Sequence, residues 1–133
     1  MIAVLDASAA IEIAINKPSS ALLRETLIKA DLVLAPDIFP SEITNAFWKY
    51  GTFSDLPADK CEKGIAYCLD LIDDYIDTRG LCFEALAESL RTKHSAYDLF
   101  YLVAARRNNA VLATRDKKLA KIAKEMNISA KGI

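Results

Sequence analysis

The sequence predicts an α/β protein in which helices cover both faces of a parallel sheet. Short apolar runs, typical of buried strands, alternate along the chain with longer segments whose apolar residues recur at helical spacing. Such alternation favours strands that are joined by helical crossovers and therefore run parallel. The chain has 133 residues, 53% of them hydrophobic, which is ample for a packed core. We therefore expect one domain over residues 1–133.

The expected strands are short apolar runs bounded by polar residues, and there are about five of them. They are residues 2–5 (IAVL), 32–35 (LVLA), 80–84 (GLCFE), 110–113 (AVLA) and 128–130 (ISA). The segments with helical spacing are residues 8–15, 18–30, 37–51, 57–77, 84–93, 96–108 and 116–126. In the longest of these segments an apolar stripe lies opposite four acids that are typical of a solvated helix face: Glu62, Asp70, Asp73 and Asp77.

Four other acids follow or interrupt apolar sequence: Asp6, Glu42, Asp98 and Asp116. An isolated ionised carboxylate inside a fold costs several kcal/mol, so a positive partner is expected. The same stretches contain too few basic residues to pair with each acid. Several inward-pointing carboxylates without such partners indicate a divalent cation with oxygen ligands.

Each acid also has an ordinary structural interpretation when it is taken alone. Asp6 follows the first strand, and it or Ser8 is a candidate helix N-cap; Asp116 is another. A salt bridge to Arg106 or Lys93 would explain Asp98.

Glu42 has two such interpretations. It shares a helix face with Asn45 and Lys49, so an ion pair with Lys49 is open. A capping box with Asp37 or Ser41 is the other.

Charge is distributed unevenly along the chain, although the net charge is only −1. Residues 54–90 carry 3 basic and 9 acidic side chains, and residues 91–133 carry 10 basic and 3 acidic ones. A basic carboxy-terminal third suits a phosphate-rich partner, but solvated helix surface has the same composition. The basic residues that we expect to line or flank the site and hold phosphates are Arg91, Lys93, Arg106, Arg107, Arg115, Lys117 and Lys118.

Other residue types narrow the chemistry. His94 is the only histidine, so a catalytic triad or an imidazole pair is not available, and we interpret it as a surface or helix-end residue. Cys61, Cys68 and Cys82 lack paired C-x-x-C spacing and predict core packing rather than disulfides or zinc. An aromatic-rich region could stack bases or receive a partner, but its helical spacing favours core packing or a dimer surface: Phe47, Trp48, Tyr50 and Phe53.

The cellular location can also be predicted from what the sequence contains. No apolar run reaches the roughly 18 residues that span a bilayer, so no membrane partner is expected. Met1 leads directly into a strand-like run without a basic leader segment. We expect a cytoplasmic protein.

The order of the four acids, with their neighbours, is far more specific than any one of them. The stretches are VLDASAAIEI, SEITNAFWK and SAYDLFYLVAARRNNAVLATRDKKL. This pattern resembles the PIN-domain ribonucleases, and within them the VapC-type toxins of toxin–antitoxin pairs, over essentially the whole chain. The resemblance implies a three-layer α/β/α fold with a central parallel sheet and the four acids gathered in one pocket.

The resemblance also implies roles for individual residues. Asp6 and Asp98 would be the most direct ligands of Mg²⁺ or Mn²⁺, with Glu42 and Asp116 holding bound waters or a second ion. Other residues would orient the ligands or the substrate: Ser8, Asn45, Thr114 and Arg115. Some family members carry a further acid after the fourth one, where this chain has Lys117 and Lys118, so one or two metal ions remain open.

The function implied is hydrolysis of RNA phosphodiester bonds by a metal-activated water. The implied partners are RNA, a cognate antitoxin and a second copy of the chain in a homodimer. Two alternatives stay open: a receiver-like signalling domain phosphorylated on aspartate, and a non-catalytic PIN-like RNA-binding module.

Overall fold

A computed structural model describes all 133 residues. A parallel sheet of five strands forms the centre of the protein. The strands are β1 (Ile2–Leu5), β2 (Leu32–Pro36), β3 (Asp74–Ile76), β4 (Val111–Ala113) and β5 (Ala130–Lys131). Their order is β3-β2-β1-β4-β5, and every neighbouring pair is parallel. The central strand β1 is buried almost throughout, as expected for a strand covered on both faces. The predicted α/β fold with a five-stranded parallel sheet is therefore confirmed.

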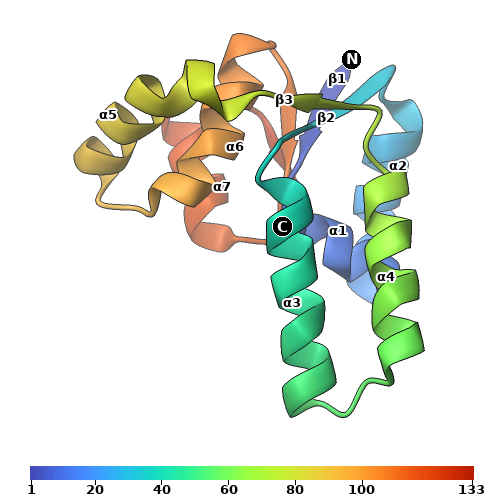
Figure 1. Cartoon of the computed structure of the whole chain (residues 1–133). Helices are drawn as coiled ribbons and strands as arrows, with labels where there is room; N and C mark the ends of the chain where they lie inside the picture. Colours follow the sequence, from blue (N-terminus) through green and yellow to red (C-terminus); the bar gives the residue numbers. More distant parts are fainter.

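Helices cover both faces of this sheet and make a three-layer α/β/α arrangement (Figure 1). They are α1 (Ala7–Ala14), α2 (Ala21–Lys29), α3 (Phe39–Phe53), α4 (Ala58–Asp70), α5 (Cys82–Thr92), α6 (Ala96–Arg107) and α7 (Lys117–Glu125), with two short 3₁₀ helices, η1 (Pro18–Ser20) and η2 (Thr78–Leu81). On one side α6 lies against β1, β2 and β4, with α5 and α7 packed beside it. On the other side α1 packs against α2 and α4.

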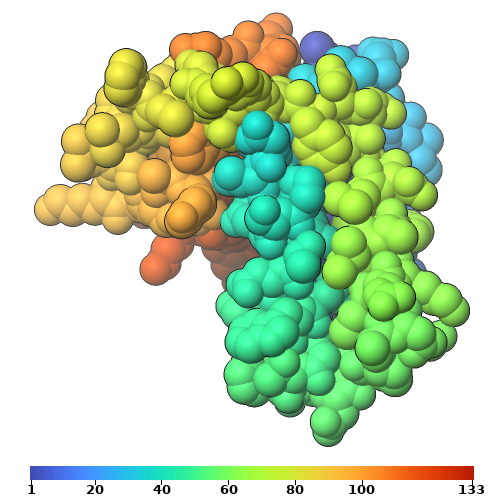
Figure 2. Space-filling view, in the orientation of Figure 1, coloured from blue at the N-terminus to red at the C-terminus, as the bar shows by residue number.

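The helices α3 and α4 lie side by side and extend together beyond the rest of the molecule (Figures 1 and 2). Together they give the protein a long helical arm next to the carboxyl ends of the strands. The first turn of α3 is at the sheet, so this helix leads from the sheet edge outward. A side chain in that first turn, such as Glu42, is therefore placed close to the strand ends.

The prediction of one helix over residues 57–77 is wrong, because the chain turns after Asp70 and forms β3. The helical apolar spacing continues as far as Ile72, so the pattern shows no boundary. The turn is held by Asp73, which accepts a hydrogen bond from the Val33 N–H at 2.7 Å and donates its own N–H to the Val33 carbonyl at 2.8 Å. Asp74 and Tyr75 are exposed because β3 is an edge strand, where charged residues are common.

The strand predicted at residues 80–84 is also wrong. These residues complete η2 and begin α5, and only Leu81 is deeply buried there. The three cysteines are free, and Cys68 is buried while Cys61 is partly buried. Cys82 is exposed on α5, so the prediction of core packing is wrong for this residue.

The strand order excludes the receiver-like alternative. Receiver domains have the order 2-1-3-4-5, in which the second strand lies at the edge of the sheet. Here β2 lies between β3 and β1, and the edge is β3.

No helix combines the length and the apolar character that crossing a membrane requires.

Replacing Gly64 with alanine is expected to destabilise the protein, although glycine to alanine in a helix normally stabilises by about 1 kcal/mol. A Cβ at Gly64 would lie 2.4 Å from two ring carbons of Phe47, which is buried between α3 and α4. We expect a loss of about 1–3 kcal/mol in urea unfolding, the usual cost of overpacking. Gly80→Ala is the control, because a Cβ there meets nothing within 4 Å. A Gly64→Ala protein as stable as the parent would contradict this packing.

Candidate active site

A cleft of about 540 Å³ opens beside the carboxyl ends of the central strands, and all four predicted acids line it. Its wall comes from α1, α3, α6 and the residue that caps the start of α7. The four acids are Asp6, Glu42, Asp98 and Asp116. Residues that span 110 positions of sequence thus meet at one edge of the sheet, where ligands bind in open α/β folds.

Asp6 is held by three donors at the end of β1. Its Oδ1 accepts hydrogen bonds from the Ser8 hydroxyl at 2.7 Å and from the Ala9 N–H at 2.9 Å. Its Oδ2 accepts one from the Thr114 hydroxyl, which follows the neighbouring strand β4. Asp6 is therefore the N-cap of α1, as one interpretation predicted, and also lines the cleft.

Asp116 has the same double role at the start of α7. Its Oδ1 accepts hydrogen bonds from the N–H groups of Lys118 and Leu119, at 2.9 and 3.1 Å. Capping uses only this oxygen, and the other oxygen has no protein donor. The capping interpretation and the metal interpretation are therefore compatible.

Glu42 accepts a hydrogen bond from the phenol of Tyr101, with 2.6 Å between the two oxygens. Tyr101 lies in the buried part of α6 and reaches across to the first turn of α3. The two alternatives for Glu42 are absent: its partner is Tyr101 rather than Lys49, and α3 begins after Ile38 without a side-chain cap. Burial, and next Glu42 itself, raise the pKa of the Tyr101 phenol, so this group remains a donor.

Asp98 lies in the first turn of α6, and its partner is His94. The distance from Asp98 Oδ2 to His94 Nε2 is 2.8 Å, a hydrogen bond that the ring donates to the carboxylate when Nε2 carries the hydrogen. The alternative explanation of Asp98, a hydrogen bond or salt bridge to Arg106 or Lys93, is wrong. Arg106 pairs instead with Glu84 and Glu88 on α5.

The tightest group of possible ligand atoms contains His94, Asp98 and Asp116. One ligand atom from each of these residues lies within 4.8 Å of the other two. This group differs from the expected one, in which Asp6 and Asp98 would be the most direct ligands. Asp6 and Glu42 line the same cleft outside this group.

Burial and mutual repulsion raise the pKa values of two carboxylates of the cleft, Asp6 and Glu42. Burial, with a smaller contribution from the neighbouring Asp98, raises the pKa of Asp6 from 3.8 to about 6, although hydrogen bonds from Thr114, Ala9 and Ser8 lower it. Burial and Asp98 also raise the pKa of Glu42. The only cationic side chain that lines the cleft is Lys49. The site therefore holds more negative charge than its own residues neutralise.

The arrangement of oxygens fits a hard divalent cation. In Glu42, Asp98 and Asp116 one carboxylate oxygen is held by a protein donor, and the other has no protein donor. Fixed carboxylates with a free oxygen are suitable ligands for Mg²⁺ or Mn²⁺. These residues could hold the ion.

Comparison with known proteins gives the family. The profile of the PIN domain matches residues 3–125. The chain belongs to the PIN-domain family. PIN domains are generally nucleases, so membership supports a hydrolase that acts on nucleic acid, and such nucleases typically use a divalent metal.

A solved structure agrees with this PIN fold. The crystal structure of PAE2754 from Pyrobaculum aerophilum superposes with a TM-score of 0.71, covers 98% of this chain and 92% of its own, and is 20% identical in sequence. At this identity the likeness shows the fold alone. Curated proteins give no match to the sequence.

Of the four other residues predicted for the site, two line the cleft and two lie outside it. Ser8 and Asn45 line the cleft. Thr114 is buried behind Asp6, and its hydroxyl also accepts a hydrogen bond from the Asp116 N–H at 3.0 Å. Arg115 does not line the cleft: its guanidinium donates to the Gly132 carbonyl and lies 4.0 Å from Glu12.

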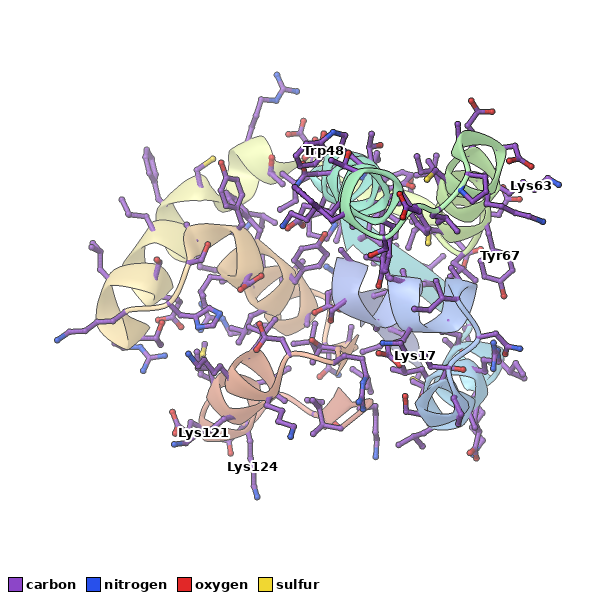
Figure 3. The ribbon with its side chains drawn as sticks, turned by 90° about the horizontal axis from the view of Figure 1, so that it is seen from below. Lys17, Trp48, Lys63, Tyr67, Lys121 and Lys124 are labelled. Atoms are coloured by element: carbon purple, nitrogen blue, oxygen red, sulfur yellow. The ribbon has the colours of Figure 1, made fainter.

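The basic residues expected around the PIN site do not line it. Arg91, Arg106 and Arg107 pair with Glu84 and Glu88 on the outer surface formed by α5 and α6. The lysines of α7 are exposed, and Figure 3 shows the side chains of Lys121 and Lys124 projecting away from the protein. Most of the basic carboxy-terminal third is thus solvated helix surface.

The aromatic region of α3 has a mixed environment. Phe47 is in the core, as the helical spacing predicted. Trp48 lies on the outer side of α3 (Figure 3) and its ring meets Phe53 edge-on at 5.7 Å. Tyr50 and Phe53 line the outer part of the cleft.

Sequence reasoning missed two residues that contact the four acids, His94 and Tyr101. His94 was interpreted as a surface or helix-end residue; it does lie between the ends of α5 and α6, but its side chain is only 14% exposed and contacts Asp98. His94 is four positions before Asp98 and Tyr101 is three positions after it. Residues with these spacings are neighbours on a helix surface. That spacing was the available signal.

Replacing Tyr101 with phenylalanine is expected to weaken binding of Mn²⁺ about tenfold, because Glu42 loses the donor that orients it. The ring remains, so the packing of α6 is kept. Tyr67→Phe is the control, since Tyr67 is exposed on α4 and points away from the cleft (Figure 3). Calorimetric titration gives the affinities, and an unchanged affinity in Tyr101→Phe would contradict this role.

Proposed function

We propose that the chain is a metal-dependent endoribonuclease that hydrolyses RNA phosphodiester bonds, with Mg²⁺ or Mn²⁺ as its cofactor. The observation that carries the proposal is the meeting of Asp6, Glu42, Asp98 and Asp116 around one cleft. A bound divalent cation would supply a water that is nucleophilic at neutral pH and a sink for negative charge on the leaving oxygen. The choice of RNA as substrate rests on the resemblance to the PIN-domain ribonucleases.

The roles of the residues follow from their contacts. The free oxygens of Asp98, Asp116 and Glu42 would hold the cation or its waters, while Asp6 adds negative charge from the end of β1. Ser8 and Thr114 fix Asp6, and Tyr101 fixes Glu42. Asn45 and Lys49 lie further along α3 on the cleft wall, where they suit a phosphate of the bound strand.

Incubation of the purified protein with labelled RNA and with DNA of the same sequence tests this proposal. We expect internal cuts in the RNA with Mg²⁺ or Mn²⁺, none with EDTA, and intact DNA. RNA binding without any cleavage in either metal would favour the non-catalytic RNA-binding alternative. Equal cleavage of DNA would overturn the assignment as a ribonuclease.

We further propose that the protein is a VapC-type toxin that a cognate antitoxin inhibits. The cleft has acids at its inner end and the aromatic side chains of Tyr50 and Phe53 at its outer end. This combination suits a peptide with a basic side chain next to apolar ones. Induced expression should arrest bacterial growth, whereas expression of Asp6→Asn should not. Normal growth with active wild-type enzyme would refute the toxin proposal.

A homodimer completes the proposal and also rests on the resemblance. The outer face of α5 supports it, since Phe83, Leu86 and Leu90 form a stripe at helical spacing and are 91%, 52% and 71% exposed. In a symmetric dimer the stripe of one copy would pack against the stripe of the other, so that both stripes are buried. Light scattering of the purified chain measures the assembly, and a monomer at micromolar concentration would contradict it.

A further inference from the structure

An imidazole lies within the group of acids that would hold the cation. His94 is the only histidine in the chain, and its side chain is mostly buried. Its Nε2 lies 2.8 Å from Asp98 Oδ2, and one of its ring nitrogens lies within 4.8 Å of carboxylate oxygens of both Asp98 and Asp116. A structural histidine that only completes the end of a helix would not need this position.

The backbone on both sides of His94 is held firmly. Lys93 ends α5 in the left-handed conformation, with φ of 57°, and Ser95 caps α6. The hydroxyl of Ser89 donates a hydrogen bond to the His94 carbonyl oxygen. The short connection between two helices therefore directs the ring toward Asp98.

The distances agree with those between donor atoms that share one metal ion. Two bonds of about 2.1 Å at a right angle place their donor atoms about 3 Å apart, and opposite donors lie about 4.2 Å apart. The 2.8 Å between His94 Nε2 and Asp98 Oδ2 is close to the first value, and all three ligand atoms lie within 4.8 Å of one another, slightly more than the second value. Metal binding would use the neutral tautomer that carries its hydrogen on Nδ1, in which the Nε2 lone pair faces the cation and replaces the hydrogen bond to Asp98.

We propose that His94 is a nitrogen ligand of the cation held by Asp98 and Asp116, and that the site consequently prefers transition-metal dications such as Mn²⁺ and Co²⁺ to Mg²⁺. This inference rests on the proposed metal-dependent function and adds a ligand to it. Imidazole binds first-row transition metals well, whereas Mg²⁺ strongly favours oxygen ligands and keeps its waters. A ring nitrogen in the site therefore selects between the two classes of ion.

Calorimetric titration of Mg²⁺, Mn²⁺ and Co²⁺ into the untagged chain and into His94→Gln tests the selection. Glutamine keeps an N–H donor for Asp98 but removes the aromatic nitrogen. We expect His94→Gln to lose about tenfold or more in affinity for Mn²⁺ and Co²⁺, and little for Mg²⁺. Equal losses for all three ions would mean that His94 only positions Asp98, and unchanged affinities would mean that it has no part; both outcomes overturn the inference alone.

A spectroscopic measurement on the unaltered chain makes the test independent of folding of the variant. Because the chain has one histidine, ring-¹⁵N labelling gives one pair of imidazole nitrogen signals. Zn²⁺, a diamagnetic dication, should shift one of the two strongly, and Mg²⁺ should not. Binding of Zn²⁺ at the site without this shift overturns the inference and leaves the metal-dependent function standing. Absence of binding by every dication overturns both.

Discussion

Replacement of Asp6 by asparagine is expected to abolish RNA cleavage and to raise the melting temperature of the metal-free protein. The carboxylate is only 5% exposed and contributes charge to a cleft whose other acids are Glu42, Asp98 and Asp116. Removing one charge weakens the hold on a cation whose catalytic contribution is several kcal/mol, so we expect at least a loss of about 100-fold in rate. The asparagine oxygen can still accept from the Ala9 N–H and cap α1.

The gain in stability has a separate cause. Without a cation the carboxylates repel one another, and Asp98 already raises the pKa of Asp6. A neutral side chain of the same shape relieves that repulsion. Asp70→Asn is the matched control, because Asp70 is exposed on α4 and should affect neither property. Retained cleavage together with a clear fall in the metal-free melting temperature would defeat the prediction.

The metal-free protein is expected to become more stable as the pH falls from 7.5 to about 5. Burial raises the pKa of Asp6 to about 6 from 3.8, and it raises the pKa of Glu42 as well. The folded protein therefore takes up protons at a higher pH than the unfolded chain, and the free energy of unfolding increases on acidification through that range. The full gain for Asp6, roughly 3 kcal/mol, would be reached only below its unfolded pKa of 3.8, so between pH 7.5 and 5.5 we expect about 1 kcal/mol.

At lower pH other carboxylates should oppose the gain from Asp6. A hydrogen bond from Ser19 lowers the pKa of Glu12, and a hydrogen bond from Arg91 lowers the pKa of Glu88. Both groups stabilise the folded state when ionised, so protonating them at lower pH removes stability. Urea unfolding in EDTA at pH 7.5 and 5.5 measures the effect in wild type and in Asp6→Asn. The variant should lose most of the difference, and a wild type that is less stable at pH 5.5 would contradict the assignment.

Much of the sheet could be predicted because its central strands are buried on both faces. A strand of this kind is apolar at every position, so β1, β2 and β4 are recognisable in sequence. The edge strands are different: β3 is exposed and charged, and β5 has only two residues. Tertiary pairing with β2, including the hydrogen bonds of Asp73 to Val33, makes β3 a strand, and no local pattern encodes such pairing.

The four acids could be predicted to meet because each lies at a strand end or in a first helical turn near that edge. Their partners could not be ranked from sequence, since a nearby position does not say which way a side chain points. Arg106 is eight residues from Asp98 on the same helix, which is about 12 Å along its axis. It therefore lies near Glu88 at the other end of α6, whereas His94, across the turn, reaches Asp98.

Anomalous diffraction from crystals soaked in Mn²⁺ would show whether the four acids share one ion. We expect an anomalous peak in the cleft within bonding distance of carboxylate oxygens from Asp98 and Asp116, with Asp6 and Glu42 facing the same ion or its waters. A cleft without a peak at saturating Mn²⁺ would contradict this expectation, as would a peak bound only to acids on the outer helices.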